Sequence, residues 1–386
     1  MSLSQLVEMS NRYGGDEEFV LAGGGNTSYK EDGVISVKGS GVGLSDITEE
    51  QFVRMDIGKL LEMVKREYPD SMSNSEREEK ALADMMEARL LYETAKRPSV
   101  ESVLHAMFPY KFVLHVHPPL INGLTCGKYG KEACEKLFGD KAVWIDLAKP
   151  GLVLAQTCNK IFNTYADEKG KYPQIAILQN HGIFIAADTV EEIDTLMVYV
   201  VDTLKKHIEN LRLSNDVDSI KPYVEIKPDF EAVSYDKDMV DSIEHKLKSL
   251  YSGDGNAAVL FCANKQVSEL VTDEKSFAPV SKPFSPDHIV NCKDEPLYIK
   301  KDADIEAEFT AYTAKKGYNP KIVAVQGLGF FAISESLKNA ERAKALFLDA
   351  IKIATYAKSF GGVNPLDDEF TDFILNWEVE AYRSKA

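Results

Sequence analysis

Two segments of the chain follow one pattern, in which short apolar runs flank a glycine turn and a long amphipathic helix follows. The first segment, QIAILQNHGIFIAA, starts at Gln174, and the second, KIVAVQGLGFFAIS, starts at Lys321. Apolar runs around such a turn predict a pair of strands, and Thr189 and Ser336 are residues suited to cap the helices that follow. Because turn, glycine and helix agree, we expect two copies of one architecture. Convergence of two strand–turn–helix units is the simpler alternative.

A weaker similarity links FPYKFVLHVHPPL with SPDHIVNCKDEPL, and in both a proline precedes a short predicted strand and another closes it. On these alignments, His181 falls on Leu328, His115 on Cys292 and His117 on Asp294. Leucine has no donor atom, so we expect the second copy to lack a metal site. A polar stretch with Pro222 and Pro228 predicts a linker. The expected organisation is a metal domain at 1–215, a linker at 216–233 and a degenerate lobe at 234–386.

Composition restricts the partners and the compartment. The net charge is -16, and no basic stripe interleaved with aromatics is present, so nucleic acid and anionic membranes are poor partners. The N-terminus lacks the features of a signal peptide, and no segment approaches the roughly 20 apolar residues of a membrane span. The five cysteines form no C-x-x-C pair. Reduced thiols in a cytoplasmic protein are therefore the expected state.

Local patterns predict the elements of the first half. Residues 19–39 indicate strand, glycine turn, strand, turn and strand, and 111–117 indicate a short strand stopped by Pro118. Thr48 is suited to cap a helix through LLEMVKREY. Further helices are expected at 2–13, 76–94 and 102–108.

The most specific chemical pattern is His115-Val116-His117 on the predicted strand. Residues i and i+2 of a strand point to the same face, so both imidazoles can reach one ion. His181 lies in the Asn-His-Gly turn of the same half. Alone, H-x-H is often a surface pair, and a turn histidine often bonds its own backbone. Together they offer three ligands and leave one open position, the arrangement of catalytic zinc. Imidazole also suits other first-row divalent metals.

Glu101 precedes the short helix that leads into the histidine strand. It could serve as a base, as a fourth ligand or as an ordinary first-turn glutamate favoured by the helix dipole. His105, four residues later, is expected to pack or to support the site rather than to bind metal.

Two small-residue turns could bind an anion through backbone N–H groups. One is Gly23-Gly24-Gly25-Asn26-Thr27-Ser28 and the other is Lys38-Gly39-Ser40-Gly41. The first is neither a Walker loop nor G-x-G-x-x-G. If the turns lie close together they would form a phosphate cradle; two ordinary hairpin turns are the alternative.

The ordered set of G-N-T-S, KGSG, S-x-E, H-x-H-P and N-H-G resembles the class II (zinc-dependent) aldolase/adducin family over roughly residues 5–210. The resemblance implies a three-layer α/β/α fold with a mainly antiparallel sheet. It implies metal ligands at His115, His117 and His181 and an acid/base at Glu101. Substrate and phosphate contacts are implied at the following residues: Asn26, Thr27, Ser40, Gly41 and Ser99.

One departure from the family pattern concerns the phosphate. Where family aldolases often have S-S-E, this chain has Ser99-Val100-Glu101. Either Lys38 compensates for the missing hydroxyl or the anion differs. Tyr129 is a candidate for the tyrosine acid that some members use.

The C-terminal half resembles the extended aldolase portion of bifunctional rhamnulose-1-phosphate aldolase/short-chain dehydrogenase proteins. With no Rossmann fingerprint in the sequence, we expect no dehydrogenase domain here.

The resemblance implies an aldolase that cleaves a ketose 1-phosphate of the rhamnulose or fuculose type to dihydroxyacetone phosphate and an aldehyde. The metal would polarise the carbonyl as a Lewis acid, and Glu101 would move a proton at the resulting carbanion carbon. A 4-epimerase, a dehydratase and a non-catalytic adducin-like assembly module are the alternatives. The expected partners are a small sugar phosphate and further copies of the chain in a homo-oligomer.

Overall fold

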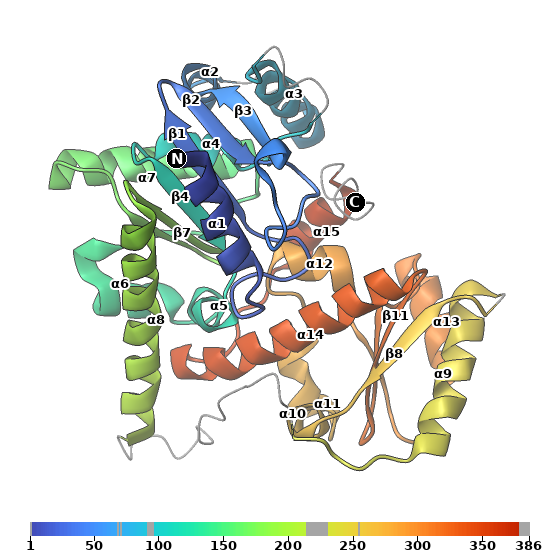
Figure 1. The fold of residues 1–386 in the computed structure, drawn as a ribbon. Coiled ribbons are helices and arrows are strands. Elements are labelled where there is room, and N and C mark those ends of the chain that lie inside the picture. The colour runs from blue at the N-terminus through green and yellow to red at the C-terminus, as the bar shows by residue number, and fades with distance from the viewer. Residues whose placement is uncertain are drawn as a thin grey trace.

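A computed structural model of the chain describes residues 2–67, 69, 72–90, 96–213, 231–253 and 255–377. It contains a seven-stranded and a four-stranded sheet, each with its own helices (Figure 1). We call residues 2–213, around the larger sheet, the first lobe and residues 231–377, around the smaller sheet, the second lobe. Most of the predicted linker, 216–230, lies outside the described residues.

The first sheet has the strand order β3-β2-β1-β4-β7-β6-β5 and is antiparallel except between β5 and β6. A mainly antiparallel sheet was expected. Its strands are β1 (Asn26–Glu31), β2 (Val34–Lys38), β3 (Phe52–Asp56), β4 (Phe112–Val116), β5 (Val143–Ile145), β6 (Ile175–Leu178) and β7 (Gly182–Ala187). In β1 and β4, Asn26 lies opposite His115, so the first small-residue turn ends beside the histidine strand.

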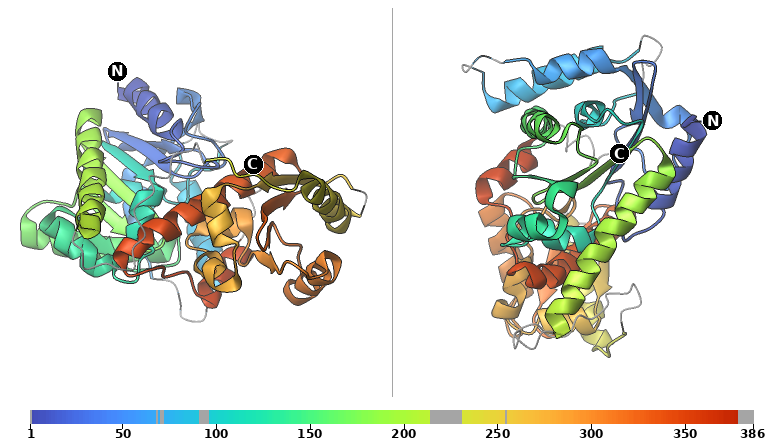
Figure 2. Two further views of the ribbon diagram at one scale, coloured as in Figure 1. Left: turned by 90° about the horizontal axis from the view of Figure 1, so that it is seen from below. Right: turned by 90° about the vertical axis from the view of Figure 1, so that its left-hand side faces the viewer.

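Helices pack on both faces of this sheet because alternate strand residues enter two separate apolar cores. One core takes Leu114 and Val116 against α1 (Ser2–Gly14), α5 (Pro119–Thr125), α6 (Gly130–Phe138) and α8 (Val190–Leu213). The other takes Val113 against α2 (Ile57–Val64), α3 (Asn74–Glu87), α4 (Ser102–Met107) and α7 (Leu152–Lys169). Figure 2 (right) shows α8 and α1 on one side of the sheet. His115 lies two residues after Val113 and His117 lies four after it, so both point to the same face of the sheet as Val113.

The second sheet has the order β8-β11-β10-β9. Its strands are β8 (Ala258–Cys262), β9 (Leu297–Ile299), β10 (Ile322–Val325) and β11 (Gly329–Ser334). Its longer helices are α9 (Lys237–Ser252), α13 (Ile305–Lys316) and α14 (Leu337–Ala357), and the shorter ones are α10 (Lys265–Leu270), α11 (Glu274–Phe277), α12 (Pro286–Cys292) and α15 (Asp368–Asn376). The expected turn at Gly327 and the helix capped by Ser336 are both present.

The two sheets share one pairing scheme over four strands. The order β4-β7-β6-β5 in the first sheet matches β8-β11-β10-β9 in the second, with the same strand directions. Leu178 pairs with Gly182 in one hairpin, and Val325 pairs with Gly329 at the same point of the other. Even the turn glutamines behave alike, because Oε1 of Gln179 accepts from the Leu147 amide and Oε1 of Gln326 from the Lys301 amide, each at 3.2 Å.

This pairing corrects the weaker sequence alignment. Cys292 and its neighbours form helix α12, not a strand, because Ser285-Pro286 places proline at the first helical turn, where its missing N–H costs nothing. The true counterpart of β4 is β8. His115, opposite Phe184, corresponds to Phe261, opposite Phe331, and His117 corresponds to Ala263.

The helix predicted at 76–94 is too long, because α3 ends at Glu87 and Arg89 forms an isolated β-bridge with Met55; residues 91–94 lie outside the described residues. Two other local predictions in the first lobe were wrong. Thr48 starts a single 3-10 turn, and the residues after it form β3 because Val53 and Met55 alternate into a core. Asp56 caps the helix instead. Residues 19–21 form irregular structure and not a strand, and the Phe19 carbonyl accepts from the amide of His117 at 3.2 Å.

Helix α14 joins the lobes. It starts at the second sheet and runs beneath the first lobe (Figures 1 and 2), where Tyr356 and Phe360 enter a first-lobe core. Asn180 adds a polar connection, since its amide donates to the carbonyls of Phe284 (3.0 Å) and Asn364 (2.8 Å). α15 packs against Val100 and Leu147 of the first lobe.

Helices α5 and α14 pack so closely at Gly123 that we expect a larger side chain there to destabilise the protein. A Cβ on Gly123 would overlap the Cβ of Tyr356, so Gly123→Ala should lower the free energy of unfolding by about 1–3 kcal/mol. Urea unfolding measures this. Gly43→Ala is the matched control, because its nearest neighbour would be Asp46 Oδ1 at an ordinary 3.5 Å. Equal stability of the two variants would mean that α14 does not pack on α5 this closely.

Candidate metal centre

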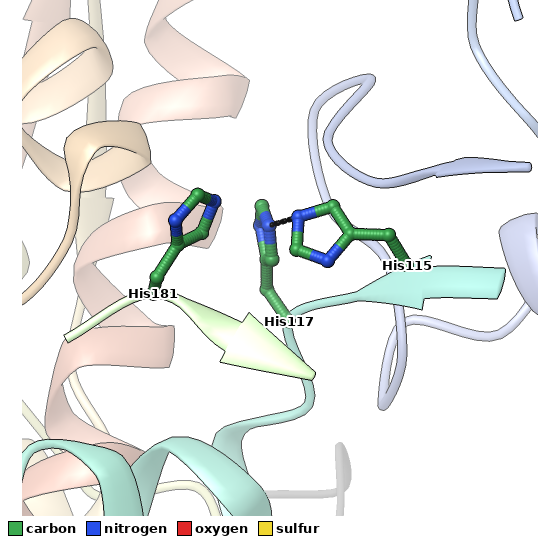
Figure 3. Close-up of side chains that lie close together, drawn as sticks. All are labelled: His115, His117 and His181. Atoms are coloured by element: carbon green, nitrogen blue, oxygen red, sulfur yellow. Dashed lines mark hydrogen bonds between the residues drawn. The ribbon is translucent and has the colours of Figure 1, made fainter. Parts of the chain in front are cut away.

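Three histidine side chains from two elements converge at the end of the first sheet (Figure 3). His115 lies in β4, His117 directly follows it, and His181 lies in the β6–β7 turn. One ring nitrogen from each lies within 4.8 Å of the other two, and the Nε2 atoms of His115 and His117 are 2.9 Å apart. The predicted convergence is present, although the group is wider than the roughly 4 Å that Zn–N bonds of ~2.0–2.1 Å would give.

Hydrogen bonds at the far side of two rings decide which nitrogen points inward. Nδ1 of His115 donates to the Ile183 carbonyl at 3.0 Å, since a carbonyl can only accept. Nδ1 of His117 donates to the Asp287 carboxylate at 2.7 Å. Burial lowers the pKa of His115 to about 4, so this ring is neutral near pH 7. With its proton on Nδ1, His115 presents the Nε2 lone pair to the centre, and Nε2 of His117 also faces the centre, as in metal-binding imidazoles.

The Glu101 carboxylate lies beside the three histidines and adds a negative charge to the cluster. Its Oε1 is buried without a hydrogen bond and lies 3.3 Å from His115 Nε2 and 3.2 Å from His181 Nε2. Burial alone would raise the pKa of Glu101, but His115 and His181 hold it well below its ordinary value. The Glu101 carboxylate and the imidazole nitrogens converge at these distances. A divalent cation at their centre would satisfy all of them, so the residues fit a metal ion.

A buried chain of hydrogen bonds orients Glu101. Asn26 Nδ2 donates to Glu101 Oε2 at 2.6 Å and to Ser99 Oγ at 3.2 Å. Asn26 Oδ1 accepts from Nε2 of His105, whose Nδ1 accepts from Ser28 Oγ at 2.8 Å. His105 thus supports the site from behind, and Asn26 fixes which carboxylate oxygen faces the histidines.

Asp287 is the site residue that sequence reasoning missed. It comes from α12 of the second lobe, 170 residues from its partner His117. No spacing within the sequence predicts the contact. The Ser-Pro-Asp helix start could have been recognised, but not the docking of that helix on the first lobe.

A cavity of about 580 Å³ adjoins the histidines and is lined by both lobes, a size that suits small-molecule ligands. Of the predicted residues, it brings together the following: Asn26, Ser40, Gly41, Ser99, Glu101, His117 and His181. The two small-residue turns are adjacent, because Lys38 Nζ donates to the carbonyls of Gly23 (2.9 Å) and Val42 (2.8 Å).

His115 is fully buried and does not line the cavity, and two further predicted residues do not reach it. Thr27 faces the other side of β1, where its fully buried hydroxyl hydrogen-bonds Ser10 at 2.7 Å. Tyr129 starts α6, with 63% of its surface exposed, and no described residue lining the cavity is a tyrosine. Val100 lines the cavity where the family often has serine, and it packs against the cluster that holds α15.

Residues 4–208, more than half of the chain, match the family model described as Class II Aldolase and Adducin N-terminal domain. The chain belongs to the class II aldolase and adducin family. This family fits the order of motifs around the histidine cluster, and the matched span ends inside α8.

Individual relatives are more distant. An uncharacterized oxidoreductase, YuxG, of Bacillus subtilis is 24% identical over 99% of this chain, which spans 58% of that protein's length. The N-terminal class II aldolase domain of a conserved Thermoplasma acidophilum protein is 26% identical, with a TM-score of 0.45, covering 54% of this chain and 94% of that one. An L-fuculose-1-phosphate aldolase from Thermus thermophilus is 13% identical, with a TM-score of 0.36, covering 55% and 98%. Among the described helices of the chain, none has the length and apolar character to cross a membrane.

The hydrogen bond between His117 and Asp287 leads us to expect that replacing Asp287 changes the affinity for metal. Asp287→Asn should weaken Zn²⁺ binding by about tenfold, the lower end for partners of metal-binding histidines, because the amide oxygen still accepts from Nδ1 but carries no charge. Competition with a chromophoric chelator measures the affinity. Asp302→Asn, on an exposed site of the same lobe, is the control. Unchanged affinity in Asp287→Asn would remove Asp287 from the metal centre.

Proposed function

We propose that this chain is a metal-dependent aldolase that cleaves a ketose 1-phosphate of the rhamnulose or fuculose type to dihydroxyacetone phosphate and an aldehyde. The observation that carries the proposal is the cluster of three imidazoles around the buried Glu101 Oε1, which has no hydrogen bond. The cluster opens onto a cavity that also contains the two small-residue turns. A non-catalytic module has no need of a buried carboxylate that lacks a donor.

In this proposal His115, His117 and His181 hold Zn²⁺ or another first-row divalent ion. When bound, the ion supplies Lewis-acid polarisation of the substrate carbonyl. Ser40, the Gly41 backbone and Ser99 bind the phosphate beside Asn26. Lys38 closes the cradle by tying its two turns together, since its ammonium already serves two backbone carbonyls.

Glu101 moves the proton. Cleavage between C3 and C4 leaves the bonding electrons on C3, and the C4 hydroxyl loses its proton as that carbon becomes the aldehyde. C3 must therefore gain a proton to give dihydroxyacetone phosphate. Glu101 is a carboxylate fixed by Asn26, with its free oxygen facing the histidines, and it exchanges this proton with the substrate.

We further propose that the first lobe has the three-layer α/β/α arrangement of the family and that the second lobe is a degenerate copy of it. The shared pairing scheme supports a duplication. At the three positions equivalent to the metal ligands the second lobe has Phe261, Ala263 and Leu328, none of which offers a ligand atom. In this proposal its role is to complete the cavity.

Replacing the proton carrier should separate metal binding from turnover. Glu101→Gln should retain metal and lose at least about 100-fold in kcat, the usual contribution of a positioned acid/base. Aldehyde release from a panel of ketose 1-phosphates measures turnover, and mass spectrometry measures the metal. Glu306→Gln, exposed on α13, is the matched control.

Three outcomes would contradict the proposal. Full activity of Glu101→Gln would exclude its role as proton carrier. Epimerised substrate without free aldehyde would indicate a 4-epimerase. Protein purified without added metal that contains none, and that releases no aldehyde after Zn²⁺ is added, would favour an assembly module.

A further inference from the structure

The second-lobe wall of the cavity carries a surplus of positive charge. Lys293, Lys321 and Arg342 all line it, and Glu335 is the one carboxylate that lines the same wall apart from Asp287, which serves His117. The chain as a whole has a net charge of -16, so a local group of three cations is unusual for it. The other carboxylate lining the cavity, Glu101, lies beside the histidines.

Only one of these cations is neutralised. Lys321 Nζ lies 2.8 Å from Glu335 Oε2 and also donates to Ser334 and Tyr251. The half-buried Lys293 ammonium lies 5.0 Å above the Tyr318 ring and makes no salt bridge in the described part of the chain. The half-buried Arg342 guanidinium has no hydrogen bond or salt bridge to any described residue. Buried or half-buried charges normally have partners, so an unpaired Lys and Arg in one cavity point to a missing anion.

The fold does not require these cations, as the first lobe shows. By the shared pairing of the hairpins, Lys321 corresponds to Gln174, and the helix positions Asn339 and Arg342 correspond to Glu192 and Thr195. In the first lobe Gln174 donates to Glu192 at 2.7 Å, so the equivalent positions there carry no positive charge. The second lobe therefore carries basic residues where the same architecture does without them.

Helix α12 connects Lys293 to the histidine cluster. Lys293 directly follows α12, the helix that contains Asp287, the partner of His117. Lys293 is six positions after Asp287, which corresponds to about 9 Å at a rise of 1.5 Å per residue. Lys293 has a left-handed backbone with φ of 67°, so the chain leaves the helix sharply at this residue. Burial and the nearby Lys321 lower the pKa of Lys293, which an anion would reverse.

We propose that Lys293 and Arg342, on the second-lobe wall of the cavity, bind a second anionic group of the substrate, a phosphate or a carboxylate. This inference rests on the proposed aldolase function and narrows it, because the aldehyde fragment then carries an acidic group rather than the neutral end of a rhamnulose or fuculose.

Aldol condensation with dihydroxyacetone phosphate tests the preference. Glyceraldehyde 3-phosphate and succinic semialdehyde, as phosphate and carboxylate probes, are compared with neutral glyceraldehyde. The wild-type chain should prefer at least one acidic aldehyde by about tenfold or more in kcat/KM, and that ratio should collapse in Lys293→Gln/Arg342→Gln. Lys300→Gln, exposed and paired with Glu274, should keep it. The better acidic probe identifies the anion. Equal use of neutral and acidic aldehydes by the wild type would overturn the inference.

A binding measurement separates this inference from the proposed function. Calorimetric titration with inorganic phosphate should find two sites per wild-type chain and one in the folded double variant. If no aldehyde condenses but one phosphate site is lost in the variant, the aldolase proposal fails and the anion site stands. If the double variant binds as many phosphates as the wild type, the anion site is wrong whatever the enzyme does.

Discussion

The hydrogen bond between His117 and Asp287 couples the candidate metal centre to the arrangement of the two lobes. It orients one candidate ligand of the first lobe with a carboxylate of the second. Its position depends on α12, a helix of seven residues, which would be marginal alone. Contacts to both lobes hold it, since His288 Nε2 lies 3.1 Å from Asp349 in α14 and Asn180 donates to the carbonyl of Phe284 before the helix. The same helix then delivers Lys293 to the cavity.

Features encoded by local pattern were predictable from the sequence. The H-x-H strand, the Asn-His-Gly hairpin and the Ser336-capped helix depend on a strand period of two, a turn residue and a cap. The convergence of the three histidines followed from strand parity and a shared domain. The helix α12 was misread as a strand because a short apolar run such as Ile289-Val290 fits either structure. Asp287 and the cation wall could not be predicted, because only the docking of two distant lobes brings them to the histidines.

The two lobes contribute opposite ends of their sheets to the cavity. The first lobe uses the end of its sheet where the β6–β7 turn lies, and His181 occupies that turn. The second lobe faces the cavity with the start of β10 and the end of β11, at Lys321 and Ser334. The contact between the lobes therefore joins two different surfaces. If the lobes arose by the proposed duplication, loss of ligand atoms at one end of the second lobe and gain of cations at its other end would have made them complementary.

Charge acts on two length scales in this molecule. The net charge of -16 repels an anionic substrate at a distance, but screening limits that effect to roughly 8 Å at physiological ionic strength. Inside the cavity, backbone amides of the small-residue turns and the ammonium and guanidinium groups of the second lobe would lie next to a bound anion. Attraction there is stronger per charge, because the effective dielectric is lower than in bulk solvent. The proposed anionic substrate would meet these groups only after it has entered the cavity. Added salt, which screens the long-range repulsion, should not slow its arrival as it would for a basic protein that steers by long-range attraction.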